Sequence, residues 1–159
     1  MSKIFGIDPG TAITGFGVIG VDAGKFSFID AGVIRTPAKQ ALELRLETIY
    51  ADLSQLIKEH NPDFIAIEQI YFANNVKTAI SVAQARGVAM LAAVHGGGEV
   101  VEYTPLQIKQ AITGYGRAEK KQMQDMVKIL LGMNEISKPD DAADALAIAI
   151  CHGQTLATS

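Results

Sequence analysis

Apolar residues recur between residues 40 and 60 with the period of an amphipathic helix. They stand four, three, four and three positions apart, at Leu42, Leu46, Ile49, Leu53 and Leu56. Charged and polar residues fill the opposite face, so the pattern predicts a helix with one buried side. Asn61-Pro62-Asp63 ends this helix, and residues 63–70 then predict a strand.

Three β-rich runs precede this helix. Residues 3–9 predict a buried strand, and residues 14–21 and 25–35 predict two more. Asp22-Ala23-Gly24 has the turn chemistry expected between antiparallel strands, so the three strands should form a meander. A right-handed crossover through the amphipathic helix would lay the strand that follows it parallel to the first strand.

The second half of the chain alternates between helical and extended patterns. Residues 76–94 have the period of a helix but are apolar on more than one side, which indicates burial in the core or against a partner subunit. Residues 99–103 predict a fifth strand. The remaining helices are predicted from Pro105 onward, over 118–131 and over 139–152. A capping box over 137–140 should open the last of them. Together these elements predict an α/β fold with a five-stranded mixed sheet flanked by helices.

Composition narrows the class of protein. A chain of 159 residues suits one domain, over 1–159. With 48% hydrophobic and 19% charged residues, it should be globular rather than disordered. No apolar run approaches the ~20 residues of a transmembrane helix, and Met1-Ser2-Lys3 leads into a strand rather than a signal peptide. The single cysteine, Cys151, cannot form an internal disulfide, which favours a cytoplasmic location.

Charge is distributed unevenly. The chain has a net charge of −3, yet residues 103–128 contain five basic and two acidic residues, a local net charge of +3. The basic residues are Lys109, Arg117, Lys120, Lys121 and Lys128. A local patch of this kind can bind phosphates even when the whole molecule is acidic. A solvated helix surface would explain the same charges.

Four carboxylates stand where predicted core elements end or begin. Asp8 ends the first strand, Glu68 ends the strand parallel to it, and Asp141 and Asp144 open the final helix. In open α/β sheets, ligands collect beyond the carboxyl ends of the strands. Asp141 and Asp144 share a helix face in the first turn, where the helix dipole favours the ionised form. The alanines after them allow close packing on the sheet, so all four acids are expected to meet.

Carboxylates that converge raise one another's pKa unless a cation lies between them. Ligand sets made only of oxygen suit a hard cation such as Mg²⁺, which also accepts phosphate oxygens. Two such cations about 3.5–4 Å apart would support phosphodiester hydrolysis by activating water and stabilising the leaving 3′-oxygen. Any one of these acids is more simply explained as a strand-end or helix-capping residue, but the four together favour a metal site.

Other features give weaker indications. Residues 8–15 also resemble the first phosphate loop of actin-like ATPases and sugar kinases, but that family needs a second domain for which this chain has no room. Tyr71-Phe72 could stack on an unpaired base or could simply pack. Three histidines lack ligand spacing: His60, His95 and His152. Cys151 is expected to be a small core residue.

Several stretches together resemble the RuvC family of bacterial Holliday-junction resolvases. They are Gly6-Ile7-Asp8-Pro9-Gly10, Thr14-Gly15-Phe16-Gly17, Ala66-Ile67-Glu68-Gln69, Gln84-Ala85-Arg86-Gly87-Val88-Ala89, Ala118-Glu119-Lys120 and Asp141-Ala142-Ala143-Asp144-Ala145-Leu146-Ala147. Their order and spacing cover nearly the whole chain. The resemblance implies a ribonuclease-H-like fold, a homodimer, and symmetrical nicking of four-way DNA junctions in recombination and repair. It also implies dependence on Mg²⁺, with Mn²⁺ as a substitute, and cooperation with the RuvA–RuvB branch-migration motor.

The resemblance also assigns roles to individual residues. It implies that the catalytic, metal-binding acids are Asp8, Glu68, Asp141 and Asp144, while Asp140 falls outside this set. Tyr71 stands where the family places an aromatic residue, commonly Phe, that stacks near the junction centre. Lys109 and Lys120 resemble the residues that contact the DNA backbone. The helix over 76–94 resembles the dimer-forming helix.

Functions from other classes remain open on the residues alone. A non-catalytic protein that binds DNA junctions would need the basic segment but not four acids spaced for a metal. A nucleotide-hydrolysing switch would need the Gly-rich first loop but neither Glu68 nor the pair Asp141 and Asp144. A related ribonuclease-H-like nuclease acting on RNA is distinguished only by the family resemblance.

Overall fold

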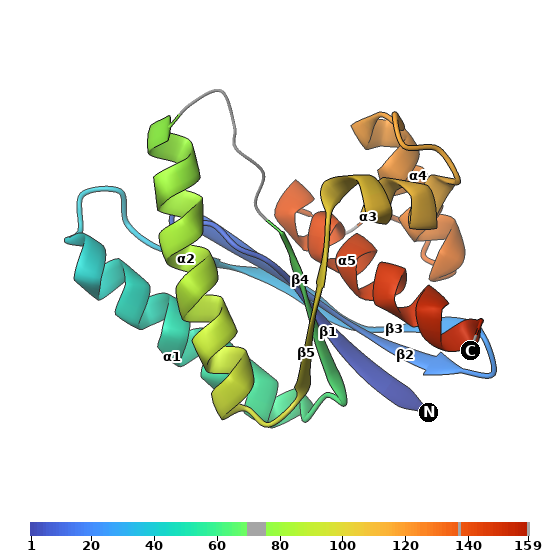
Figure 1. The fold of residues 1–159 in the computed structure, drawn as a ribbon, viewed down its shortest axis with the longest axis horizontal. Helices are drawn as coiled ribbons and strands as arrows, with labels where there is room; N and C mark the ends of the chain where they lie inside the picture. The colour runs from blue at the N-terminus through green and yellow to red at the C-terminus, as the bar shows by residue number, and fades with distance from the viewer. Residues whose placement is uncertain (70–75, 137, 159) are drawn as a thin grey trace.

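The structure is a computed structural model that describes residues 1–69, 76–136 and 138–158. The elements are β1 (Ser2–Asp8), β2 (Ile13–Asp22), β3 (Lys25–Arg35), α1 (Leu42–His60), β4 (Phe64–Glu68), α2 (Val76–His95), β5 (Glu99–Tyr103), α3 (Pro105–Thr113), α4 (Lys120–Leu130) and α5 (Asp140–Ala157). They form three layers, in which α1 and α2 cover one face of the sheet (Figure 1). On the other face α5 packs on the sheet, with α3 and α4 beside it.

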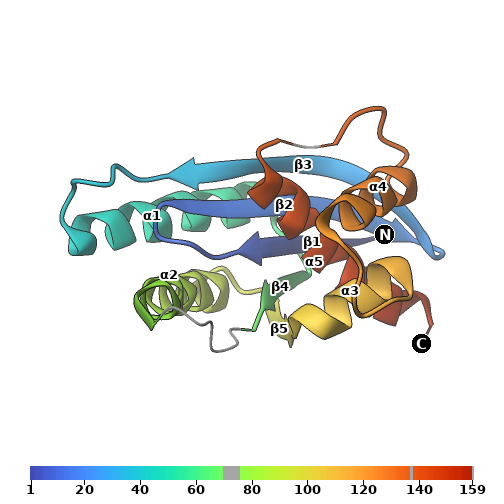
Figure 2. The ribbon, with the colours of Figure 1, turned by 90° about the horizontal axis from the view of Figure 1, so that it is seen from above.

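The five strands form one mixed sheet in the order β3-β2-β1-β4-β5, which Figure 2 shows from top to bottom. The strands β1, β2 and β3 are antiparallel neighbours, so the predicted meander is confirmed. The strand β4 pairs in parallel with β1, and β5 pairs in parallel with β4. The predicted crossover through α1 is therefore also confirmed. The carboxyl ends of β1 and β4 consequently lie side by side.

Alternation along the strands decides which side chains face α5. Phe5, Ile7 and Ile65 belong to the core cluster on the side of α1 and α2. Ile4 and Ala66 belong to the core cluster on the side of α5. Successive side chains of a strand point to opposite faces. The even-numbered residues that end these strands, Asp8 in β1 and Glu68 in β4, therefore point to the face that α5 covers.

Small residues let α5 lie close to the sheet. Its residues Ala142, Ala143, Ala145 and Ala149 are at most 2% exposed. Gly6 of β1 lies beneath them in the sheet. A Cβ added to Gly6 would lie only 2.1 Å from the carbonyl oxygen of Ala145. Such a separation is impossible for a real side chain, so glycine is required there. The alanines alone predicted close packing, and the glycine of the sheet completes it.

The structure extends and corrects the predicted final helix. It continues to Ala157 rather than ending near residue 152. The predicted capping box over 137–140 would begin at Ser137, which lies outside the described residues. The N-cap residue of α5 is Pro139, and no side chain of the described residues caps this end. Capping boxes occur instead at Thr104 with Gln107, before α3, and at Glu119 with Gln122, before α4. Among the described helices, none combines the length and apolar character needed to cross a membrane.

Candidate active site

The candidate site is assembled where β1, β2 and α5 meet. Asp8, the last residue of β1, pairs with Gly15 of β2. A Cβ added to Gly15 would lie 2.1 Å from the carbonyl oxygen of Asp141. The first turn of α5 therefore rests directly on the sheet beside Asp8. Close packing at Gly15 thus brings Asp8 and Asp141, which are 133 positions apart in the sequence, into one site.

Three of the four predicted acids form a compact group. Ligand atoms of Asp8, Asp141 and Asp144 all lie within 4.8 Å of one another, and each of the three residues is half-buried. Asp141 and Asp144 reach the group together because residues three apart share a helix face. Carboxylate oxygens at this spacing fit a hard divalent cation.

Burial and mutual repulsion raise the pKa of the acid at the centre of the group. The pKa of Asp8 is raised from 3.8 to about 8, first by burial and then by the charges of Asp144, Glu68 and Asp141. Burial is also the largest cause of the raised pKa of Asp144, with Asp141 adding to it. A bound cation would remove this repulsion and favour the ionised carboxylates. The charge distribution of the site therefore fits a cation, which was the reason for predicting a metal there.

Glu68 lies beside the compact group but not within it. It ends β4, whose residue Ile67 pairs with Ile7 of the parallel strand β1. Burial raises the pKa of Glu68, and the charge of Asp144 raises it further. Glu68 is electrostatically coupled to the group, although its carboxylate is not among the three within 4.8 Å. All four acids were expected to lie together. Three of them do, and the fourth, Glu68, lies next to this group.

Asp140 has a different environment from its neighbours. Its carboxylate pairs with the Lys120 ammonium at 3.0 Å and accepts a hydrogen bond from the Gln124 amide at 3.1 Å. These contacts lower the pKa of Asp140. Asp140 therefore points to α4 rather than into the compact group, in keeping with its predicted exclusion from the set.

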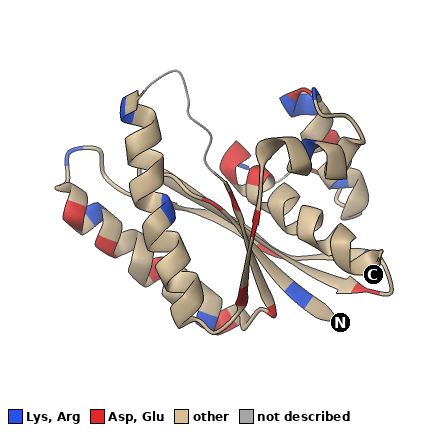
Figure 3. Cartoon of the chain, in the orientation of Figure 1, with Lys and Arg blue, Asp and Glu red and all other residues tan. Residues whose placement is uncertain are grey.

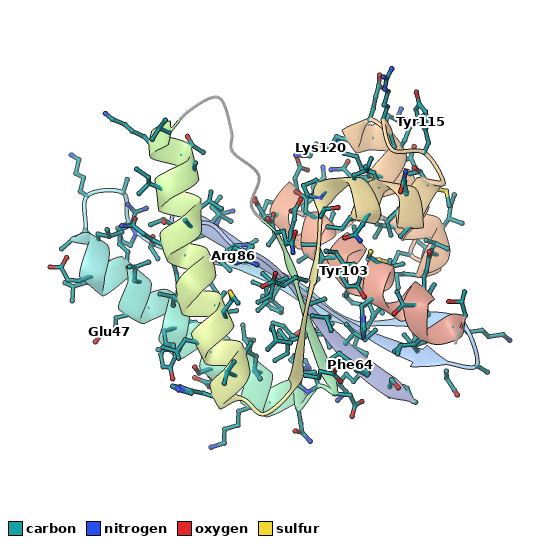
Figure 4. All side chains as sticks on the ribbon, viewed as in Figure 1. Glu47, Phe64, Arg86, Tyr103, Tyr115 and Lys120 are labelled. Atoms are coloured by element: carbon teal, nitrogen blue, oxygen red, sulfur yellow. The ribbon has the colours of Figure 1, made fainter. Side chains whose placement is uncertain are left out.

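The two predicted DNA-contacting lysines flank the acids. The charge of Lys120 lowers the pKa of both Asp8 and Asp144. The charge of Lys109, on α3, lowers the pKa of Glu68. Figure 3 shows the acidic start of α5 and the basic residues of α4 on the same side of the sheet, and Figure 4 labels Lys120 there. The site therefore combines a cation-binding centre with ammonium groups that could contact phosphates.

Residues 70–75 are outside the described residues, so the predicted stacking residue Tyr71 and its neighbour Phe72 are too. The loop after Asp8 is described. The backbone N–H of Gly10 donates to Thr14 Oγ1 at 3.3 Å, and Thr14 Oγ1 donates back to the carbonyl of Gly10 at 2.6 Å. The Gly10 N–H is thus already bonded within the loop, which disfavours the phosphate-loop interpretation of residues 8–15.

Sequence reasoning missed two contributions to the site. Gly15 was part of the family resemblance, but its role beneath α5 was not foreseen. The second is Arg86 of α2, whose Nε donates to the backbone carbonyl of Glu68 at 3.1 Å. A glycine at alternate positions of a strand opposite an alanine-rich helix is a signal that could have identified Gly15. The Arg86 contact joins residues 18 apart in the sequence, and no local pattern predicts it.

Comparison with known proteins agrees with this geometry. The family model described as "Crossover junction endodeoxyribonuclease RuvC" matches residues 4–152. The chain is 54% identical over 152 residues to the crossover junction endodeoxyribonuclease RuvC of Alkaliphilus oremlandii, covering 96% of this chain and 93% of the relative. It is 52% identical over 152 residues to that of Clostridioides difficile, covering 96% and 90%.

Solved structures agree on the fold. The structure titled "T. thermophilus RuvC in complex with Holliday junction substrate" superposes with a TM-score of 0.93 and is 33% identical, covering 99% of this chain and 96% of that one. The yeast mitochondrial Holliday junction resolvase Ydc2 is 14% identical, with a TM-score of 0.69, and supports the fold alone. The predicted ribonuclease-H-like α/β fold is therefore confirmed. With the family model matching residues 4–152, the chain belongs to the RuvC family of crossover junction endodeoxyribonucleases.

Proposed function

We propose that this protein resolves four-way DNA junctions by Mg²⁺-dependent hydrolysis of one phosphodiester bond in each of two opposing strands. The observation that carries the proposal is the group of Asp8, Asp141 and Asp144, with ligand atoms within 4.8 Å of one another at the carboxyl end of β1. Its substrate class is supported by the relative from T. thermophilus, which was solved in complex with a Holliday junction substrate.

The metal-binding role is assigned to Asp8, Asp141 and Asp144, with Glu68 completing the set. The raised pKa of Asp8, to about 8, supports this assignment, because like charges that close together need a compensating cation. When bound, divalent cations supply electrophilic assistance to the phosphate and lower the pKa of water. Mg²⁺ suits the set because carboxylate oxygens and phosphate oxygens are its preferred ligands.

The residues of the chain supply binding and orientation. Lys109 on α3 and Lys120 on α4 flank the acids and would attract the phosphates of the strand to be cut. Lys120 would first have to exchange its Asp140 partner for a phosphate. That exchange is cheap, because both side chains are more than half exposed, at 59% and 56%, and exposed pairs contribute little.

A homodimer is part of the proposal, because two equivalent nicks require two equivalent sites. The support comes from α2, whose outer face has an exposed stripe at four- and three-residue spacing: Ile80, Gln84, Gly87, Leu91 and Val94. Its apolar members Ile80, Leu91 and Val94 are 54%, 50% and 63% exposed. Such spacing is that of a helix-to-helix seam.

The two outermost residues of the stripe are placed symmetrically about its central glycine. Ile80 stands seven positions before Gly87 and Val94 seven positions after it. An antiparallel copy of α2 on a two-fold axis at Gly87 would therefore place Ile80 opposite Val94 of the second copy. An added Cβ on Gly87 would meet nothing within 4 Å, so the glycine leaves open space for a close approach. This self-complementarity favours a second copy of the chain as the occupant.

A substrate panel tests the function. The purified protein would be incubated with Mg²⁺ and end-labelled four-way junction, matched duplex, single-stranded RNA and ATP. We expect paired nicks in the junction alone. Cleavage of RNA in preference to the junction would favour the related nuclease function, and tight junction binding without cleavage in Mg²⁺ or Mn²⁺ would favour a non-catalytic binding protein.

A further inference from the structure

Arg86 is a largely buried cation on the face of α2 that is turned to the sheet. Its side chain is 17% exposed, and Figure 4 labels it between α2 and the strands. The guanidinium uses all three of its nitrogens. Nε donates to the carbonyl of Glu68 at 3.1 Å, Nη2 pairs with Glu102 at 2.7 Å, and Nη1 lies 3.2 Å from Met90 Sδ. Burying a cation is costly unless it is paired and hydrogen-bonded, and Arg86 has both kinds of partner.

The contact with Glu68 is made to its backbone, from the face opposite to its side chain. Glu68 ends β4, and its side chain shares the α5 face with Ala66. Arg86 approaches from α2, on the other face. A hydrogen bond to the carbonyl fixes the orientation of the peptide at the strand end, and this orientation sets the direction in which the carboxylate projects.

A second carboxylate holds the guanidinium in place. Glu102 of β5 pairs with Arg86 and also accepts a hydrogen bond from the Gln69 amide at 3.1 Å. These hydrogen bonds lower the pKa of Glu102, which keeps it ionised as the partner of Arg86. The backbone N–H of Gln69 donates to the carbonyl of Tyr103 at 2.8 Å. The end of β4 is thus joined to α2 through the carbonyl of Glu68 and to β5 through Gln69.

We infer that Arg86 is a positioning residue, which holds Glu68 beside the compact group of Asp8, Asp141 and Asp144. This inference rests on the proposed metal site. The three acids of the group are held by β1 and by the first turn of α5, but Glu68 stands outside their 4.8 Å spacing. The distance of the Glu68 carboxylate from the three acids therefore depends on the backbone at the end of β4, to which Arg86 donates a hydrogen bond.

The geometry requires arginine rather than any cation. A planar guanidinium donates in several fixed directions at once, whereas the ammonium of lysine is a single point of charge on a flexible stem. Lysine at position 86 could still pair with Glu102, but its single nitrogen cannot stand at both the Nε position beside the Glu68 carbonyl and the Nη2 position beside Glu102. Arg86→Lys therefore keeps the charge and loses this two-nitrogen geometry.

The experiment measures metal binding as well as cleavage. Mn²⁺ binding by electron paramagnetic resonance would be compared in unmutated protein, Arg86→Lys, and the control Met90→Leu, which loses only the sulfur contact and keeps its volume. We expect Mn²⁺ affinity to fall about tenfold in Arg86→Lys, the loss typical of residues that support metal ligands. Junction affinity without metal and the sedimentation of the protein should change less than twofold. Affinity for Mn²⁺ within twofold of unmutated protein, in folded Arg86→Lys, would overturn the inference.

A double variant tests whether Arg86 acts through Glu68. If it does, adding Arg86→Lys to Glu68→Gln should weaken Mn²⁺ binding no further, whereas independent effects would add. Additive losses would overturn the inference. Should Arg86→Lys fail to fold, Glu102→Ala removes the partner of Arg86 at a site 31% exposed and carries the same comparison. If unmutated protein neither binds Mn²⁺ nor cleaves junctions, the proposed function fails instead, so the two failures are distinguishable.

Discussion

Gly15 lies beneath the carbonyl oxygen of Asp141, at a separation that leaves no room for a side chain. A Cβ at this position would lie 2.1 Å from that oxygen and 3.1 Å from Asp141 Cβ. Because Gly15 is also the strand partner of Asp8, it sets the distance between the acid of β1 and the acids of α5. The candidate site thus depends on a residue that has no functional group.

Gly15→Ala should therefore damage the site more than the fold. The first turn of α5 must move away from β2, which we expect to cost about 1–3 kcal/mol of stability, typical of overpacking. Cleavage should fall by about 10²-fold, because small misplacements of reacting groups cost this much. The control is Gly32→Ala, where the atoms nearest to the new Cβ belong to the Phe16 ring, at 3.0 Å, rather than to the backbone of α5. Equal activity in the two variants, measured by junction cleavage, would contradict this role for Gly15.

Asp8→Asn should abolish cleavage while leaving junction binding intact. The change removes a proposed metal ligand but no contact with DNA, and it lowers repulsion of the phosphates. We expect cleavage in Mg²⁺ to fall by more than about 100-fold, beyond the loss typical of residues that only support ligands. Asp22→Asn is the matched control, since Asp22 is also a strand-end acid but is exposed at the far end of β2. Cleavage by Asp8→Asn near the unmutated rate would refute the metal site.

The same substitution should stabilise the metal-free protein at alkaline pH. The pKa of Asp8 is raised from 3.8 to about 8 in the folded state. The folded state therefore holds its proton more tightly than the unfolded state, and this contribution to stability is lost as pH rises through that range. In EDTA, the melting temperature of Asp8→Asn should exceed that of unmutated protein by more at about pH 8 than at about pH 5. A difference that is constant with pH would show that Asp8 does not titrate in this way.

Lys109→Ala and Lys120→Ala should each weaken junction binding in a salt-dependent manner. If each lysine contacts one phosphate, the slope of log affinity against log salt should decrease in magnitude by about one. Lys25→Ala is the control, because Lys25 begins β3 and pairs with Asp22, at the opposite end of β2 from Gly15. Unchanged slopes in both variants would return the segment over 103–128 to the role of a solvated surface.

Leu91→Glu should convert a dimer into a monomer without unfolding it. Leu91 is 50% exposed in the single chain, so a charge there costs little until a second copy covers it. Val88 and Met90, in contrast, pack against the core, and charges at those positions would destabilise the monomer itself. Ile129→Glu on α4 is the control, since Ile129 is 66% exposed and lies away from α2. Sedimentation of unmutated protein as a strict monomer, with paired nicking intact, would exclude the dimer.

Most of the architecture was predictable because it depends on local patterns. The spacing from Leu42 to Leu56 defined α1, and the turn over 22–24 fixed the meander. Handedness then placed β4 beside β1, so the proximity of Asp8 and Glu68 followed from topology alone. The acids that open α5 could be added because a helix rich in alanine must pack closely.

What could not be predicted depends on three-dimensional detail. Glu68 was expected within the group, but β4 ends where its carboxylate only adjoins the other three. The hydrogen bond from Arg86 to the Glu68 carbonyl and the ion pair of Arg86 with Glu102 depend on how α2 lies relative to the strand ends. The apolar character of α2 indicated two buried sides, but only the exposed fractions distinguish Leu91, which faces outward, from Val88.

His152, near the end of α5, should make the protein sensitive to acid. His152 is 6% exposed, and its Nδ1 lies 2.6 Å from the Tyr103 hydroxyl. Its Nε2 is buried and has no hydrogen-bond partner among the described residues. Burial lowers the pKa of His152, although the charge of Glu99 acts in the opposite direction. The unfolded state therefore takes up a proton more readily, so this contribution to stability is present above about pH 6.5 and lost as pH falls below it.

Replacing the ring isolates this effect from that of Asp8, which acts with the opposite sign. Protonation of Asp8 favours the folded state as pH falls, whereas protonation of His152 disfavours it. His152→Phe keeps an aromatic ring against Phe64, whose centroid lies 4.5 Å away, and removes the titrating group. Between about pH 7 and about pH 5, its melting temperature relative to that of unmutated protein should rise steadily. If the melting temperatures of the two proteins depend on pH in the same way, the pKa of His152 is the same in the folded and unfolded states, which would contradict this prediction.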